Sequence, residues 1–135
     1  MASRKLAREF ALQSLFGVEV GHRDPDEMIS ETCGTTDSEE RRFVKDLVLG
    51  TLDHATESDG VIAPLLEGWT IERLPTIDRL LLRMSVFELA HRDTPRAVVI
   101  NEAVELAKKF STDDSPRFVN GVLSSVSKHF AQGPA

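Results

Sequence analysis

The stretch VVINEAVELAKKFSTDDSPRFVNGVL, Val98 to Leu123, predicts two helices joined by a short polar turn. In its first half, apolar side chains recur at the i, i+3, i+4, i+7 spacing of one buried helix face. The residues of this face are Ala103, Leu106, Ala107 and Phe110. The second half begins with Asp114-Ser115-Pro116, where a capping side chain precedes a proline at the first helical position. The stretch therefore predicts a helical hairpin.

The turn carries more hydrogen-bonding side chains than the packing of two helices requires. They are Asn101, Asp113, Asp114, Arg117 and Asn120. Asn120 fits either a contact to a nucleobase edge or a brace against Asn101, and Asp114 fits either a ligand contact or a helix cap. Phe118, on the first turn of the second helix, fits either a stacking platform or the core. This polar turn is the first candidate site.

The remainder of the chain also has helical periodicity. It predicts helices from Ser3 to about Val20, over a short segment from Asp24 to about Cys33, from Asp37 or Ser38 to about Thr56, and from Thr76 to about His91. In the first of these, the expected buried stripe is Leu6, Ala7, Phe10, Ala11, Leu15 and Val18. The pattern through Gly60 and Pro64 fits one kinked helix or two separate helices. The segment ending at His91 is apolar over more than half its circumference, so we expect it to be central.

No segment of useful length alternates with period two, so the chain is predicted to be an all-α protein of six or seven helices. Its 135 residues fit a single domain. No apolar run approaches the roughly 20 residues of a membrane helix, and no secretion signal is recognisable. The single cysteine, Cys33, cannot form an internal disulfide, which fits a cytoplasmic protein.

Charge is distributed unevenly along the chain. The net charge of −6 argues against a general nucleic-acid binder. Residues 24–59 hold eleven acidic and three basic residues, whereas the first helix begins with Arg4, Lys5 and Arg8. Cations at a helix N-terminus oppose the helix dipole, so this group indicates either a binding role or an ordinary solvated helix end. The acidic segment supports a different hypothesis, in which the chain is a protein-only interaction module or a homodimer.

Motifs of catalysis and metal binding are missing from the sequence. It contains no GxxxxGK[ST], GxGxxG, HExxH or CxxC pattern. The four histidines, His22, His54, His91 and His129, are far apart in the chain and lack ligand-like spacing. We therefore expect no enzyme activity, no metal and no cofactor, and the hypotheses that remain are those of binding.

Four segments carry a resemblance to a known family. They are RKLAREFALQSLF (Arg4 to Phe16), DRLLLRMSVFEL (Asp78 to Leu89), VVINEAVELAKKF (Val98 to Phe110) and DSPRFVNGVL (Asp114 to Leu123). Together they resemble the bacterial transcription antitermination factors of the NusB family, in order and over nearly the whole chain. The resemblance implies two small packed helical bundles, here an N-terminal subdomain of about 1–68 and a C-terminal one of about 69–131, followed by a frayed tail, 132–135.

The resemblance also implies a function. It implies binding of single-stranded boxA-type RNA from ribosomal RNA leaders, together with the small-subunit ribosomal protein that acts as NusE, in a complex with other Nus factors and RNA polymerase. Some relatives form homodimers. The RNA contacts implied at matching positions are Arg4, Lys5, Arg8, Gln13, Phe16, Asp114, Ser115, Arg117, Phe118 and Asn120, with Arg79 and Arg83 as additions. Glu88 falls on the face that receives the protein partner. Position 16 is Phe where many relatives have Tyr, which keeps stacking and loses a hydroxyl.

Overall fold

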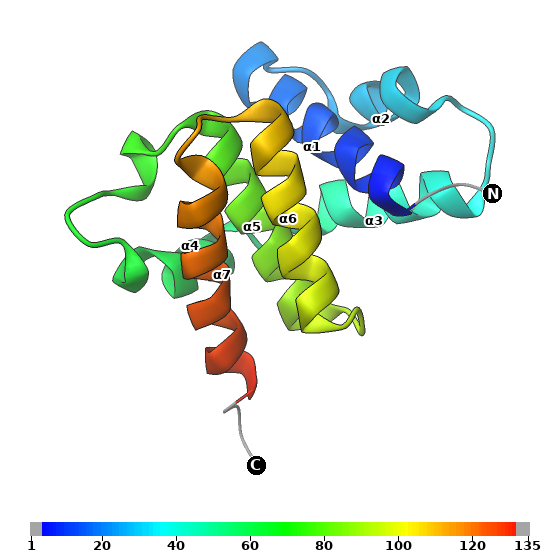
Figure 1. Cartoon of the computed structure of the whole chain (residues 1–135). Helices are drawn as coiled ribbons and strands as arrows, with labels where there is room; N and C mark the ends of the chain where they lie inside the picture. The colour runs from blue at the N-terminus through cyan, green and yellow to red at the C-terminus, as the bar shows by residue number, and fades with distance from the viewer. Residues whose placement is uncertain (1–3, 132–135) are drawn as a thin grey trace. The chain divides into compact units, whose positions relative to one another are not determined.

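The computed structural model describes residues 4–131, and all regular secondary structure in that part of the chain is helical, with no strand (Figure 1). This confirms the predicted all-α class. The α-helices are α1 (Arg4–Gly21), α2 (Pro25–Cys33), α3 (Glu39–Asp53), α4 (Ala55–Ile62), α5 (Thr76–His91), α6 (Arg96–Phe110) and α7 (Ser115–Ala131), with 3-10 turns η1 (Ala63–Leu65) and η2 (Ile71–Arg73). None of the described helices combines the length and apolarity needed to cross a membrane. The predicted tail, 132–135, and the cap Ser3 lie outside the described residues.

The chain divides into two compact units, the first ending at Asp53 and the second beginning at His54. The sequence placed this division near residue 68. The observed division comes earlier because α4 packs against α5 and α7. The segment of uncertain continuity forms two separate helices, because α3 ends at Asp53 and α4 begins at Ala55. Gly60 lies inside α4, and Pro64 lies in η1 directly after it.

The first unit is a three-helix bundle in which each helix contacts the other two. Its core is formed by apolar residues from all three helices: Ala7, Ala11, Leu12, Leu15, Ile29, Val44, Leu47 and Val48. The predicted start of α2 is confirmed, since Asp24 accepts a hydrogen bond from the Glu27 N–H and Pro25 opens the helix. The Met28 side chain of α2 packs over Gly17 of α1, with its Cε 2.5 Å from where a Cβ would stand.

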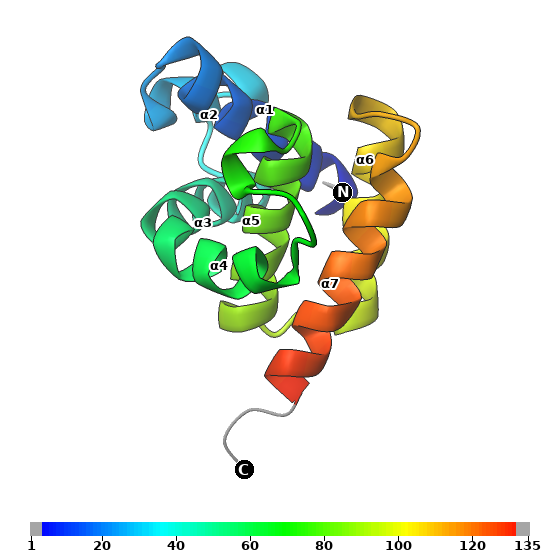
Figure 2. The ribbon, with the colours of Figure 1, turned by 90° about the vertical axis from the view of Figure 1, so that its left-hand side faces the viewer.

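The second unit is built around α5, as the sequence predicted. This helix contacts α4, α6 and α7, and it buries side chains around most of its circumference: Leu80, Leu81, Leu82, Met84, Val86 and Phe87. The predicted hairpin is also present, with α6 and α7 side by side in both views (Figure 1, Figure 2). The turn between them is short, which fixes the ends of both helices and the polar residues they carry.

Candidate nucleic-acid interface

The α6–α7 turn is held by a buried carboxylate on α5. The two oxygens of Asp78, which is 3% exposed, accept hydrogen bonds from the hydroxyls of Ser111 (2.6 Å) and Ser115 (2.9 Å). Asp78 lies in the first turn of α5, where the helix dipole favours a negative charge. Ser115 also accepts a hydrogen bond from the Thr112 N–H at 3.2 Å. The carboxylate therefore ties both ends of the turn to the central helix.

This network determines how the predicted RNA-binding residues of the turn are presented. Ser115 is 1% exposed and its hydroxyl points inward to Asp78, so it holds the turn from within. Asp114 is exposed, and its carbonyl accepts the Phe118 N–H at 3.2 Å as α7 begins. Arg117 and Asn120 are exposed, and Phe118 is half-buried. The turn thus offers a ring, an amide, a carboxylate and a guanidinium from one short segment.

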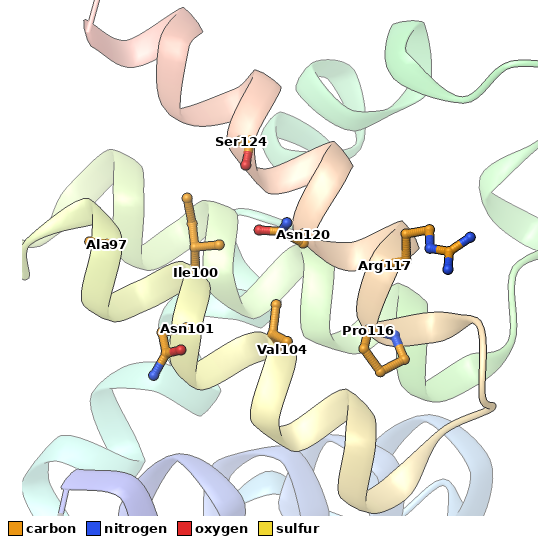
Figure 3. A pocket seen from close by; sticks show the side chains of 8 residues that line it. All are labelled: Ala97, Ile100, Asn101, Val104, Pro116, Arg117, Asn120 and Ser124. Carbon is orange, nitrogen blue, oxygen red and sulfur yellow. The ribbon is translucent and has the colours of Figure 1, made fainter.

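An open groove of about 590 Å³ runs between α6 and α7 beside this turn (Figure 3). Its floor is apolar, with Ile100 and Val104. In Figure 3 the Asn101 side chain points away from Asn120, and the Arg117 guanidinium extends away from the other labelled side chains. Asn101 therefore does not brace Asn120, which was one of the two roles suggested by the sequence, and the Asn120 amide is available to a ligand.

The two additional arginines on α5 are engaged within the second unit. Arg83 forms a two-pronged ion pair with Asp59 of α4, with N–O distances of 2.7 and 2.8 Å. Arg79 donates to the Leu74 carbonyl at 3.3 Å. Both side chains are half-buried. Arg83 therefore joins α4 to α5, whereas Arg79 lies at the edge of the segment that precedes α5.

The N-terminal arginines of α1 pack on one aromatic ring of the same unit. The guanidinium carbon of Arg4 lies 3.8 Å from the ring centroid of Phe43, and that of Arg8 lies 5.2 Å away. Arg4 also pairs with Glu39 at 3.3 Å and stays exposed, whereas Arg8 is only 5% exposed. The α3 residues Glu39 and Phe43 thus compensate the unfavourable helix-dipole placement of these cations, and the structure gives Arg8 a packing role.

Lys5, Gln13 and Phe16 occupy a different side of α1. At about 100° per residue they fall within one sector of roughly 80°, and all three are exposed, Phe16 at 39%. The basic start of α1 therefore separates into two faces. Arg4 and Arg8 pack against Phe43 of α3. Lys5, Gln13 and Phe16 form an exposed strip that combines a cation, an amide and a ring.

The acidic segment is extensively paired within the first unit. Ion pairs join Arg42 to Asp37 at 2.8 Å, Arg23 to Glu31, and Lys45 to Asp26 at 4.0 Å, in addition to the Arg4 pair. Arg42 hydrogen-bonds the carboxyl group of Asp37 and lowers its pKa. These pairs reduce the negative field that the segment charge alone would suggest.

Glu88 is buried at 1% exposure, and its carboxylate accepts a hydrogen bond from the Thr94 hydroxyl at 2.7 Å. Thr94 lies in the short link between α5 and α6. The carboxylate is therefore buried next to this link and holds it through Thr94.

Sequence reasoning missed two groupings in the second unit. The first is the hydrogen-bonded group of Asp78, Ser111 and Ser115. The sequence around Asp78 does not indicate which distant residues it contacts. The other is His54, Glu57 and His91, whose ligand-type atoms all lie within 4.8 Å of one another, making them the metal-capable group among residues 4–131. The rings of His54 and His91 also pack against Phe87 in tilted contacts, at 5.3 and 5.5 Å between ring centroids, so packing accounts for their position.

Comparison with known proteins decides the family. The model of the NusB family matches residues 5–128. The chain belongs to the NusB family. The transcription antitermination protein NusB of Symbiobacterium thermophilum is 44% identical over 135 residues, covering 92% of this chain and 88% of that protein.

Solved NusB structures have the same fold. The NusB of T. maritima superimposes with a TM-score of 0.87 at 31% identity, covering 94% of this chain and 92% of that one. A second structure, of antitermination factors NusB and NusE in complex with dsRNA, gives a TM-score of 0.83 at 30% identity, covering 93% and 96%. The resemblance noted from the sequence is therefore confirmed at the level of family and fold.

Proposed function

We propose that this NusB-family protein is an RNA-binding antitermination factor that binds boxA-type RNA of ribosomal RNA leaders together with NusE. The observation that carries the proposal is the similarity of nearly the whole chain to a NusB solved with NusE and RNA. In this role the protein acts in the cytoplasm, joins other Nus factors at RNA polymerase and helps the polymerase avoid early termination.

The exposed members of the predicted set are proposed as the direct RNA contacts. Cations bind phosphates, while rings and amides contact unstacked bases of single strands. Residues of these types come from both units: exposed Arg4, Lys5, Gln13 and Phe16 on α1, and exposed Arg117 and Asn120 with half-buried Phe118 at the turn. Asp114, which is also exposed, adds a carboxylate that can accept hydrogen bonds from base amino groups. We assign Phe118 to stacking, since its ring remains half-exposed at the turn.

The buried members are proposed to act by positioning. Arg8 supports the start of α1 against Phe43, and Ser115 holds the turn against Asp78. Arg83 is already paired with Asp59 through two hydrogen bonds. Replacing this partly buried pair by a phosphate contact would cost more free energy than replacing the exposed pair of Arg4 with Glu39. RNA binding is therefore expected to respond more strongly to loss of Lys5 or Arg117 than to loss of Arg83.

Glu88 is proposed to organise the face that receives NusE. Because its carboxylate is buried and holds Thr94, we expect it to shape the α5–α6 link rather than to touch the partner. RNA and NusE then bind at separate sites of the protein. The weak RNA contacts of α1 and of the α6–α7 turn act together in the complex with NusE, which raises the affinity for RNA.

A gel shift with purified protein, NusE and labelled RNA tests the proposal. A boxA-type RNA should be retained more tightly than an RNA with a scrambled boxA, and addition of NusE should strengthen the shift. Equal affinity for the two RNAs, with and without NusE, would refute sequence-specific boxA binding. Binding of NusE without any RNA shift would instead support the protein-only alternative.

A further inference from the structure

A second hollow, of about 290 Å³, lies on the other side of the first turn of α7 from the α6–α7 groove. Three segments of the second unit line it. The connector before α5 contributes Trp69, Leu74 and Pro75, the α6–α7 turn contributes Asp114, the first turn of α7 contributes Phe118, and Asp78 lies at the start of α5. Its volume is near the lower end of the roughly 300–1,000 Å³ of small-molecule sites, which suits a single planar group.

Trp69 is the feature of this hollow that needs an explanation. It is the only tryptophan of the chain, and 58% of its surface is exposed. It follows Gly68, whose φ of 75° lets the connector turn where other residues would be strained. A large exposed aromatic side chain beside a hollow is typical of a binding surface, since leaving it in water forgoes a substantial hydrophobic gain.

We infer that Trp69 and Phe118 form a slot that takes one unstacked base of the bound RNA. The two rings come from separate segments but border the same hollow. Every base presents a π-face to such rings, and stacking of this kind binds single strands with little dependence on sequence. The inference rests on the proposed RNA-binding function and extends it to a residue outside the predicted set.

The polar groups around the slot favour a base over a phosphate. Asp114 and Asp78 contribute carboxylates to the lining, and no Lys or Arg contributes to it among the described residues. A carboxylate repels a phosphate but accepts hydrogen bonds from the amino groups of adenine, cytosine or guanine. Of the two, Asp114 is the better acceptor for a ligand, because it is exposed while Asp78 already binds two hydroxyls.

Two arginines adjoin residues of the slot. Arg117 precedes Phe118 in α7 and is exposed, and Arg79 donates to the carbonyl of Leu74 in the slot wall. Phosphates on either side of a base held between the rings could therefore pair with cations that adjoin the slot residues. An apolar side chain of a protein partner would gain nothing from either the carboxylate or the cations, so a nucleotide is the better match.

Intrinsic fluorescence tests the inference directly, because Trp69 is the sole tryptophan. Protein loaded with NusE is titrated with the boxA-type RNA, and the same titration with Trp69→Phe supplies the background from NusE. Stacking should quench the Trp69 emission in a saturable manner. Trp69→Ala should weaken RNA binding by roughly 5- to 150-fold, the range of one base–aromatic stack, and Trp69→Phe should retain most of the affinity.

The salt dependence and a matched control complete the test. Trp69→Ala removes no phosphate contact, so the slope of log Kd against log salt should stay unchanged. Val98→Ala, which truncates another exposed apolar residue of the unit, should leave the affinity unchanged. If Trp69→Ala binds RNA as tightly as the parent, the slot is refuted while the proposed function stands. Loss of NusE binding alone would make the hollow a protein site, and absence of RNA binding by the parent would overturn both proposals.

Discussion

The Asp78 network makes a prediction about the stability of the second unit. Ser115→Ala removes the hydroxyl that donates to Oδ2 of Asp78 at 2.9 Å and accepts from the Thr112 N–H. A buried hydrogen bond to a charged group contributes about 1.5–3 kcal/mol, and the Asp78 oxygen left behind is buried. Exposed Thr112 can turn to water instead. We therefore expect a loss of about 2 kcal/mol in the free energy of unfolding.

Urea unfolding followed by circular dichroism and by Trp69 fluorescence measures this loss. In a thermal melt, the same loss of about 2 kcal/mol would lower Tm by roughly 8 °C for a chain of this size. The matched control is Ser125→Ala, the same substitution at an exposed site of the same helix. Since alanine has the higher helix propensity, the control should be neutral or stabilising by up to ~0.5 kcal/mol.

The substitution should also weaken RNA binding by loosening the turn, without changing the salt slope, because Ser115 contacts no phosphate in this account. A loss of stability below about 0.5 kcal/mol for Ser115→Ala, the range of ordinary surface substitutions, would refute the Asp78 network as the device that holds the turn.

Three further predictions follow from the structure. Gly34→Ala should lower the free energy of unfolding by about 1–3 kcal/mol, because its φ of 82° and ψ of −179° fall where essentially only glycine is stable. Gly60→Ala lies inside α4 with open space around it and should raise the free energy of unfolding by up to ~1 kcal/mol. Urea unfolding of both variants measures these changes. Burial raises the pKa of the Cys33 thiol, so at pH 8 iodoacetamide should alkylate it more slowly than a free cysteine peptide, and an equal or faster rate by mass spectrometry would contradict its placement. Glu88→Lys should lower the free energy of unfolding by about 3 kcal/mol or more, because it buries a cation in place of the acceptor for Thr94. Glu88→Gln should keep both the fold and NusE binding. A stable Glu88→Lys variant in thermal melts would mean that Glu88 is not buried.

Periodicity predicted the parts of the fold that depend on local sequence. The hairpin of α6 and α7, the central position of α5 and the Asp24-Pro25 start of α2 were all recognisable. The first helix shows the limit of such reasoning. Its predicted stripe included Leu6, which is 43% exposed, and omitted Leu12, which is 1% exposed. The helix packs against both α2 and α3, and this shifts its buried face toward Leu12.

The candidate site was predictable in its residue types and less so in their roles. Arg8 reads as a free cation in the sequence, but Phe43, 35 positions away, packs it into the first unit. Ser115 reads as a helix-start residue, whereas Asp78 gives it a buried partner on another helix. Trp69 carries no periodic signal in its connector, and only the folded second unit shows that it borders the same hollow as Phe118.

The central claim is that phosphates are bound by cations from both units, and the salt dependence of RNA affinity tests it most directly. Fluorescence anisotropy of a labelled boxA-type RNA with protein and NusE gives Kd from about 50 to 200 mM salt for the parent, Lys5→Ala, Arg117→Ala and the double variant. Each single variant should lower the log–log slope by about 0.7, and the double variant by about 1.4, the value for two phosphate contacts to a single strand. Slopes that stay at the parent value in all three variants would contradict the claim.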